Sequence, residues 1–382
     1  MKKVLIAIDS FKGCLGSLEI ATAVEEGIKD VFPLCEVVKT PVADGGEGTA
    51  EVLVSATGGQ MYTVVVNDPL MQPVSAQYGI LGDGHTAVIE MSAASGLPLV
   101  AENKRNPMLT TTYGTGQLIA DALNRGCTDF IIGIGGSATN DAGVGMLQAL
   151  GYRFFDIDGK LLGAGGQILE QIAVIDVSLR NKFIDKAIFK VACDVDNPFS
   201  GKHGAAYVFA PQKGADSQMV EALDRGLKHF ADVVKNQLGK DIISVPGAGA
   251  AGGMGGGLLA FFDARLQPGI QLALDALNFD DLLIEVDLVI TGEGRMDAQT
   301  AMGKTPQGIA QAATRKGIPI IALTGNIADA TIINNIGICG VFSIVPHLMT
   351  LQEAMNPETA YRNIRQTTKQ LFAWHRSMVN NI

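Results

Sequence analysis

Apolar and polar positions at the start of the chain predict a strand, a helix and a second strand. Residues 4–8 are continuously apolar, which is typical of a buried strand. Residues 17–31 carry an apolar side chain at every third or fourth position, which predicts a helix with Ser17 as its N-cap. Residues 36–39 predict the second strand. Because a helix joins the two strands, we expect them to be parallel neighbours in one sheet.

The same alternation returns near the end of the chain, whereas the middle differs. The elements predicted near the end are a strand at 287–290, a helix at 308–316, strands at 318–324 and 341–345, and a helix at 359–379. The elements predicted in the middle are short strands at 62–66, 77–81 and 86–90, a helix at 116–125 and a strand at 130–132. Turn signals separate the short strands of the middle, so this part of the chain differs from its two ends.

A domain inserted between two halves of another explains this order of elements most economically. We predict a discontinuous α/β domain at 1–65 and 286–382, and an inserted α/β domain with a mixed sheet at 66–285. The length of 382 residues also suits two domains better than one core.

Glycine is unusually frequent and clustered. The chain holds 46 glycines in 382 residues, about 12%, against ~7% in an average protein. Such clusters mark loops in which the backbone approaches another group closely. Residues 245–262 carry no charge, but seven of them are glycine and one is proline. We therefore predict a glycine-rich loop that leads into a buried helix, not a membrane span.

Charge and cysteine content restrict the class of protein. The net charge is −10 and the isoelectric point is near 5.0, so we expect neither nucleic acid nor an anionic membrane as a partner. The five cysteines are odd in number and form no C-x-x-C pair, and no signal-peptide pattern precedes Asp9. We therefore expect reduced thiols and a cytoplasmic location. The sequence leaves the oligomeric state open.

Polar loops with similar composition follow several predicted strands. They lie at 9–13, 43–48, 133–145, 193–198 and 291–297. Four combine glycine with a carboxylate, and 193–198 has two carboxylates without glycine. Ligands of α/β proteins collect at the carboxyl ends of strands, where such carboxylates bind Mg²⁺ or accept a proton. One loop of this kind is commonly only a turn, but the set supplies the parts that phosphoryl transfer requires.

The loop at 133–145 has two interpretations. Its backbone amides, at the start of a helix, favour a phosphate group. Alternatively Gly133, Gly135 and Ala138 match a dinucleotide fingerprint, and Asp156 lies about where a ribose-binding acid would stand. The second interpretation predicts an NAD-dependent oxidoreductase of a small hydroxy acid.

Other catalytic motifs find little support. Residues 298–305 end like a P-loop, but alanine replaces the first glycine and Pro306 follows directly, so we expect Lys304 to contact substrate. The signature motifs of protein kinases, the G-x-S-x-G elbow and histidine pairs with metal spacing are missing from the sequence.

Taken together, the loops resemble the motifs of the bacterial glycerate kinase family over essentially the whole chain. The motifs that carry the resemblance are DSFKGC, ADGGEGT, GIGGSATNDAG, CDVDNPF, GAGAAGGMG, TGEGRMD and GKTPQG, in this order. The sequence departs from the family pattern at Cys14, where serine is expected, at Gln117, where glutamate is expected, and at Ala142, where glycine is common.

The resemblance implies ATP-dependent phosphorylation of D-glycerate, with ATP and Mg²⁺ as cofactors. Members of the family form 2-phosphoglycerate or 3-phosphoglycerate. The enteric-type members that this sequence is most similar to form 2-phosphoglycerate in the breakdown of glucarate and galactarate. The family fold has two α/β domains, one discontinuous and Rossmann-like and one inserted, with a cleft between them.

We assign roles to the loop residues as hypotheses. The catalytic residues are Asp194, Asp297 and Lys12, with either aspartate as the base. The substrate-binding residues are Asp44, Arg295, Ser10 and Lys304. The residues that bind the nucleotide phosphates are Gly135, Gly136, Ser137, Thr139 and Asn140, chiefly through backbone amides. The magnesium ligands are Glu293 and Glu47.

Overall fold

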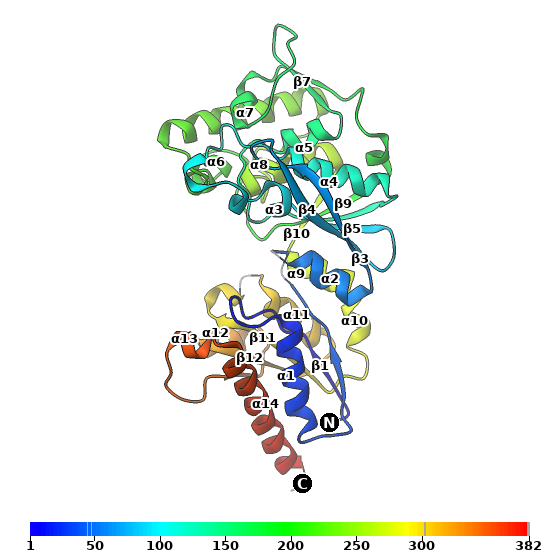
Figure 1. Cartoon of the computed structure of the whole chain (residues 1–382), viewed down its shortest axis with the longest axis vertical. Coiled ribbons are helices and arrows are strands. Elements are labelled where there is room, and N and C mark those ends of the chain that lie inside the picture. Colours follow the sequence, from blue (N-terminus) through cyan, green and yellow to red (C-terminus); the bar gives the residue numbers. More distant parts are fainter. Residues whose placement is uncertain (44, 47, 302, 380–382) are drawn as a thin grey trace. The chain divides into compact units, whose positions relative to one another are not determined.

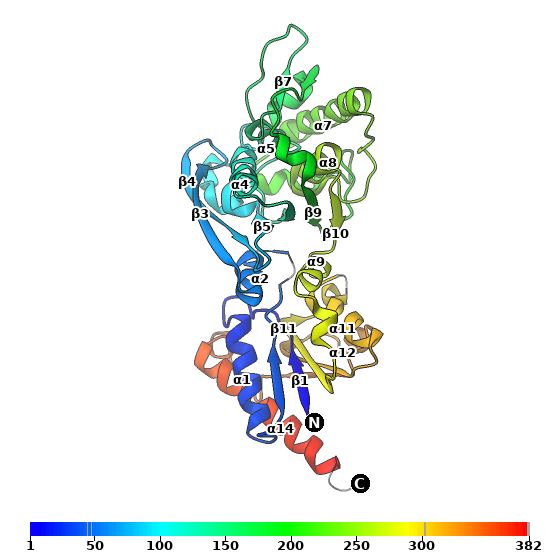
Figure 2. The ribbon, with the colours of Figure 1, turned by 90° about the vertical axis from the view of Figure 1, so that its right-hand side faces the viewer.

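The chain divides into two compact units (Figure 1, Figure 2). The computed structural model describes residues 1–43, 45–46, 48–301 and 303–379. Unit 1 comprises Met1–Asp44 and Ala273–Ile382, and unit 2 comprises Gly45–Leu272. Each unit has a hydrophobic cluster of its own, built around Ile6, Ile28 and Ile290 in unit 1 and around Phe130, Phe189 and Phe230 in unit 2.

Unit 1 contains a five-stranded parallel sheet in the order β13-β12-β11-β1-β2. The strands are β1 (Lys3–Ile6), β2 (Glu36–Lys39), β11 (Leu288–Met296), β12 (Ile320–Ile327) and β13 (Gly340–Ser343). The interior strand β1 carries three fully buried aliphatic residues in succession, as expected for a parallel strand covered on both faces.

The helices of unit 1 cover both faces of this sheet. They are α1 (Ser17–Lys29), α10 (Phe279–Leu282), α11 (Thr305–Arg315), α12 (Ala330–Asn335), α13 (Leu351–Ala354) and α14 (Pro357–Val379). Helices α1 and α14 lie against each other (Figure 1). Gly27 permits this approach, because a Cβ atom there would stand 2.6 Å from the Arg365 carbonyl oxygen.

Unit 2 contains a six-stranded mixed sheet in the order β10-β9-β6-β5-β4-β3. The strands are β3 (Gln60–Asn67), β4 (Pro73–Ile80), β5 (Thr86–Glu90), β6 (Asp129–Gly133), β9 (Ile188–Ala192) and β10 (Arg265–Gln267), with a separate hairpin of β7 (Arg153–Phe155) and β8 (Val174–Asp176). Strands β3, β4 and β5 pair in antiparallel fashion, and β5, β6, β9 and β10 pair in parallel.

The helices of unit 2 include the glycine-rich segment. They are α2 (Thr49–Thr57), α3 (Ser92–Ser95), α4 (Tyr113–Asn124), α5 (Val144–Ala149), α6 (Ala205–Phe209), α7 (Ser217–Leu238) and α8 (Ala250–Phe262), and α9 (Gly269–Ala276) crosses the chain boundary of the units. Ala251, Gly252 and Gly253 have left-handed angles at the start of α8, and the rest is a largely buried helix, as predicted. None of the helices in the described residues is long and apolar enough to span a bilayer.

The α/β class, with a parallel sheet from the two ends of the chain and a mixed sheet from its middle, is confirmed. The predicted boundaries near 65 and 285 are wrong, since the units divide after residues 44 and 272. Strand β3 pairs with β4 over its whole length, so both belong to unit 2. The predicted loop at 291–297 is also wrong, because β11 continues through Met296 in register with β12. All five cysteines are free.

Candidate active site

The strand order of unit 1 marks a place where ligands bind in other proteins. Counted along the chain as 1 to 5, its strands lie in the order 2-1-3-4-5, and the winding reverses between β1 and β11. Ligands of doubly wound sheets bind outside the carboxyl ends of the strands at such a switch point. Asp9 follows β1, and its N–H donates to the Gly292 carbonyl oxygen at 3.1 Å. Glu293 is the next residue of β11, so both carboxylates belong to this end of the sheet.

Glu293 is the central carboxylate of this group. Burial raises the pKa of its carboxyl above the ordinary value of 4.5. The Thr300 hydroxyl donates to Glu293 Oε1, and this bond and the charge of Lys304 lower the pKa. The negative charges of Asp9 and Asp297 raise it further. The group therefore holds three carboxylates and a lysine close enough to influence one another, which is typical of a reaction site.

Asp297 contacts Thr300 through its backbone N–H and the exposed Arg295 through its side chain. The Asp297 N–H donates to Thr300 Oγ1 at 3.0 Å. Arg295 Nε lies 3.3 Å from Asp297 Oδ2, and the Arg295 side chain is 67% exposed. An exposed ion pair of this kind stabilises by at most ~1 kcal/mol. The guanidinium can therefore turn toward an anionic ligand at little cost.

Three further predicted site residues lie in unit 1. The Ser10 N–H and hydroxyl lie 2.7 and 3.4 Å from Asp9 Oδ1. Lys304 is half-buried and immediately precedes α11, whose first residue, Thr305, donates its hydroxyl to Asp9 Oδ2 at 3.3 Å. Lys12 is exposed in the turn after Phe11. Asp9 itself has no predicted role, although it is the first polar residue after the apolar run at 4–8.

In unit 2 the loop between β6 and α5 is fixed from inside by Asp141. This carboxylate is fully buried, and it accepts the Thr112 N–H at 2.8 Å and the Thr112 hydroxyl at 2.9 Å. It also accepts the N–H groups of Gly143 and Gly145, both at 3.2 Å. Burial raises the pKa of the Asp141 carboxyl, and the hydrogen bonds from Thr112, Gly145 and Gly143 act in the opposite direction. Asp141 therefore holds the loop in place.

These bonds overturn the expected phosphate site at the start of the following helix. Helix α5 has only six residues, and the Gly143 and Gly145 amides at its start already donate to Asp141. The Met146 N–H donates to the Thr112 hydroxyl at 2.9 Å. Because these donors are occupied, the amides at the start of α5 do not form the anion site that the glycine pattern predicts.

A buried lysine, absent from the sequence hypotheses, holds the same loop from another side. Lys213 is 1% exposed, and its Nζ donates to Ser137 Oγ at 2.7 Å and to the Thr139 carbonyl oxygen at 2.6 Å. Burial lowers the pKa of Lys213 to about 7, against an opposing effect of Asp141. Lys213 ends a short turn after Pro211, far from the loop in sequence, and nothing in that turn predicts its role.

The predicted phosphate-binding residues occupy different environments. Gly135 and Gly136 are exposed, whereas Ser137 is buried against Lys213. Thr139 and Asn140 are fully buried, and their side-chain polar atoms have no hydrogen-bond partner within the described residues. Neither side chain reaches the surface, so the predicted contact of Thr139 and Asn140 with a nucleotide stays a prediction.

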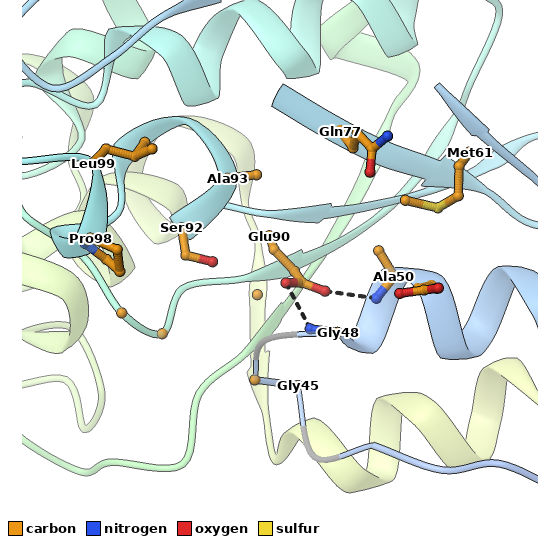
Figure 3. A pocket seen from close by; sticks show the side chains of 15 residues that line it. Gly45, Gly48, Ala50, Met61, Gln77, Glu90, Ser92, Ala93, Pro98 and Leu99 are labelled. Atoms are coloured by element: carbon orange, nitrogen blue, oxygen red, sulfur yellow. Dashed lines mark hydrogen bonds between the residues drawn. The ribbon is translucent and has the colours of Figure 1, made fainter. Parts of the chain in front are cut away.

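The exposed glycines line a pocket of about 560 Å³ (Figure 3). Its walls come from the start of α2, from β3 and β4, from the end of β5 and from the segment after β6. Glu90, at the end of β5, accepts the N–H groups of Gly48 at 3.1 Å and Ala50 at 2.8 Å. The carboxylate thereby fixes the start of α2 as one wall of the pocket.

Asp194 follows β9 in unit 2. It is exposed, and its Oδ1 accepts the N–H of Gly269, the first residue of α9, at 3.0 Å. This contact is of the type that caps a helix, so Asp194 has a structural role whatever its part in chemistry.

The predicted metal ligands are only partly within the described chain. Glu47, and the substrate residue Asp44, lie outside the described residues. In the part that is described, no cluster of three or more histidine, cysteine, aspartate or glutamate side chains has the arrangement of a metal site. Magnesium in phosphoryl-transfer enzymes is held by one or two carboxylates together with substrate phosphates, so the oxygen donors of Glu293 and its neighbours fit such an ion.

The sequence model of the glycerate kinase family matches residues 4–376. The chain belongs to the glycerate kinase family. It is 51% identical over 360 residues to the glycerate kinase of Bacillus subtilis, which covers 94% of each chain. It is 46% identical over 372 residues to the glycerate 2-kinase of Escherichia coli K12, which covers 97% of each chain. A crystal structure assigned as glycerate kinase 2 from Salmonella typhimurium LT2 has a TM-score of 0.91 and 45% identity over 99% of each chain.

Membership of the glycerate kinase family identifies the protein as a phosphotransferase, so the NAD-dependent oxidoreductase interpretation is wrong. Asp156, which supported the oxidoreductase interpretation, has a structural role. Asp156 Oδ1 accepts the N–H groups of Asp158 at 3.0 Å and Lys160 at 2.8 Å and thereby closes the turn after β7.

The structure shows the environment of two residues, Ala142 and Gln117, at which the sequence departs from the glycerate kinase pattern. Ala142 has φ of 54°, the left-handed region in which glycine is favoured. The Gln117 side chain accepts the Asn67 N–H at 2.7 Å, which ties α4 to the end of β3. Neither residue belongs to the carboxylate group of unit 1, so the departures leave that group intact.

Proposed function

We propose that the protein transfers the γ-phosphoryl group of ATP to the C2 hydroxyl of D-glycerate, which yields 2-phosphoglycerate. The observation that carries the proposal is the 46% identity, over 97% of both chains, to a protein named glycerate 2-kinase. The carboxylate and lysine group at the switch point of unit 1 supports it, because phosphoryl transfer needs cations, a base and oxygen ligands for a metal. We also propose that the reaction belongs to the breakdown of glucarate and galactarate, as the resemblance of the sequence motifs implies.

The cations of unit 1 suit the carboxylate of glycerate. Arg295 is exposed and forms a surface ion pair with Asp297, and Lys304 stands beside Glu293 at the start of α11. Lys12 is exposed on the turn after Asp9, within the same loop as Ser10. We assign Arg295 and Lys304 to the substrate carboxylate and Lys12 to the charge that develops during transfer, where a well-placed cation lowers the barrier most.

Asp297 suits the role of base better than Asp194. Asp194 Oδ1 is engaged by the amide of α9. Asp297 belongs to the group that contains Glu293 and Arg295, where a substrate hydroxyl would donate its proton to the carboxylate. The backbone bond to Thr300 orients Asp297 for this contact.

Glu293 would hold the magnesium ion that the kinase reaction requires. When bound, the ion neutralises charge on the nucleotide phosphates. Glu293 suits this task because its pKa is raised by burial and by neighbouring carboxylates, and a cation relieves both effects. The Thr300 hydroxyl fixes one of its oxygens and leaves the other for a ligand.

The test is the rate of ADP formation from ATP with D-glycerate as acceptor. We expect ADP release that depends on D-glycerate and on added Mg²⁺, with little release in the presence of L-glycerate or D-lactate. D-lactate has the same carboxylate and C2 hydroxyl but no C3 hydroxyl, so it also reports whether C3 is recognised. ADP release that is the same with and without D-glycerate would contradict the proposal.

A further inference from the structure

The pocket of unit 2 has a lining that disfavours a small anion. Its polar side chains are Glu51, Gln77, Glu90 and Ser92, and its lining within the described chain includes neither lysine nor arginine. Two carboxylates without a cation repel the carboxylate of glycerate. The substrate cations proposed above all belong to unit 1. The pocket therefore calls for a different ligand, one that brings hydroxyl groups and apolar surface.

The size and the apolar walls of the pocket match a nucleoside. The volume of about 560 Å³ exceeds what a three-carbon acid fills and lies within the ~300–1,000 Å³ range of cofactor sites. Figure 3 shows Met61 and Gln77 at one end, Ser92, Pro98 and Leu99 at the other, and Glu90 between them. An aromatic base packs well on a thioether such as that of Met61.

Along the pocket, the polar groups are arranged in the same order as the base, ribose and phosphates of a nucleotide. Gln77 Nε2 donates to Thr63 Oγ1 at 3.1 Å, which orients the amide and directs its oxygen elsewhere, as an acceptor for an amino group on a base. Glu51 offers carboxylate oxygens of the kind that accept ribose hydroxyls, whereas the Glu90 oxygens already accept the Gly48 and Ala50 amides and fix the wall beside it. The exposed backbone of Gly135 and Gly136 stands at the end with Ser92, where phosphates would leave the pocket.

We infer that this pocket binds the adenosine part of ATP, with the base near Met61 and Gln77, the ribose at Glu51 and the phosphates along Gly135–Gly136. The inference rests on the proposed kinase function and assigns the nucleotide to unit 2. It also explains the absence of a lysine in the loop after β6. Lys213 holds this loop from behind through Ser137 and Thr139, which leaves the glycine backbone open to phosphate oxygens.

The nucleoside end is tested by calorimetry with adenosine and with ADP as separate probes. Met61→Trp fills that end, and Val65→Trp is the matched control, because Val65 lies on the same face of β3, is 69% exposed and does not line the pocket. We expect Met61→Trp to weaken the binding of both probes by about tenfold or more, and Val65→Trp to leave both within about twofold.

The phosphate end has its own pair of variants. A Cβ atom at Gly135 or at Gly163 meets no other atom within 4 Å, so the fold tolerates alanine at both. Gly135 lines the pocket and Gly163 does not. We expect Gly135→Ala to weaken ADP by about tenfold and to leave adenosine unchanged, with no effect of Gly163→Ala on either probe.

Equal ADP affinities of Met61→Trp and Val65→Trp would overturn the inference. If Met61→Trp fails to fold, Gln77→Leu at an exposed position of β4 replaces it, and unchanged adenosine affinity would again overturn the inference. The proposed function fails separately. A wild-type protein that binds ADP in this pocket but does not phosphorylate D-glycerate would contradict the reaction and leave the pocket assignment standing.

Discussion

Two aspartates compete for the role of base, and single substitutions separate them. Asp297→Asn keeps the shape of the side chain but removes its charge, so turnover should fall by ~100-fold or more, the usual effect of losing a general base. Asp194→Asn keeps an oxygen that accepts the Gly269 amide, so turnover and melting temperature should stay near wild type. Steady-state rates at saturating ATP and D-glycerate measure both. The opposite pattern would make Asp194 the base.

Glu293 should carry a cost in stability that its function requires. Burial raises the pKa of its carboxyl, so the folded protein binds more protons than the unfolded chain at this group. The free energy of unfolding therefore falls as the pH rises above 4.5, the ordinary pKa of a glutamate. Glu293→Gln should be more stable than wild type near neutral pH, and this difference should disappear below pH 4.5, the ordinary pKa of a glutamate. Its turnover should fall sharply.

Urea unfolding of Glu293→Gln and wild type at several pH values measures this difference. Thr300→Val is a second probe, because it leaves the charge of Glu293 in place but removes the hydroxyl that donates to Glu293 and accepts the Asp297 N–H. A Glu293→Gln protein that is less stable than wild type at neutral pH would show that the charged carboxylate stabilises the fold.

The sequence identifies candidate-site residues that come after an apolar run. Ser10 and Asp297 follow the ends of β1 and β11, and Glu293 lies in the last part of β11, and the ends of neighbouring parallel strands meet at one edge. Lys213 could not be predicted. Its contacts with Ser137 and Thr139 join segments more than seventy residues apart, and only the fold brings them together.

At the scale of elements, β11 shows why glycine residues can lead to the wrong prediction of a loop. Glycine is depleted in strands, so Gly292 and Gly294 predict a loop at 291–297. In the fold, a Cβ atom at Gly292 would stand 2.1 Å from the Leu323 carbonyl oxygen, whereas one at Gly294 meets no atom closer than 3.6 Å. The first glycine therefore marks a close approach of two backbones inside a sheet. Pattern alone does not distinguish such a glycine from one in a turn.

These two glycines make a matched test of β11. Gly292→Ala forces the backbone of β11 and β12 apart, because the oxygen of Leu323 is held in the sheet, and should destabilise by about 3 kcal/mol or more. Gly294→Ala in the same strand should lie within about 1 kcal/mol of wild type. Thermal unfolding monitored by circular dichroism measures both. Equal melting temperatures would contradict the extended strand.

The loop after β6 should depend on Lys213 in a way that pH reveals. Burial lowers the pKa of Lys213 to about 7 from 10.5. Between these values the unfolded chain binds more protons, so wild-type stability rises with pH by up to about 1.4 kcal/mol per pH unit from this group. Lys213→Met removes this contribution, since methionine does not titrate. Denaturant unfolding at several pH values measures how the free energy of unfolding changes with pH in wild type and in Lys213→Met. Identical slopes in the two proteins would contradict a lowered pKa of Lys213.

At the scale of the whole molecule, the division into two units follows from topology. The sequence predicts the alternation of elements and the inserted segment, but not the boundaries after residues 44 and 272. Helix α2 follows β2 in sequence and yet packs on β3, β4 and β5, so it belongs to unit 2. A long-range contact of this kind leaves no local signature in the hydrophobic pattern.

Unit 2 is one continuous segment with its own hydrophobic cluster, so residues 45–272 alone should fold. We expect this fragment to unfold in one cooperative transition and to bind ADP with an affinity near that of the full chain. It should not phosphorylate D-glycerate, because the proposed base and cations belong to unit 1. Loss of ADP binding in a folded fragment would contradict a nucleotide site confined to unit 2.

The most direct test of the whole account is phosphorus NMR of the product formed from ATP, Mg²⁺ and D-glycerate. Phosphate on C2 couples to a single proton and gives a doublet, whereas phosphate on C3 couples to a CH₂ group and gives a triplet. We predict ADP together with a single new phosphomonoester doublet. A triplet would contradict phosphorylation at C2, and the absence of any new phosphomonoester would contradict the kinase assignment itself.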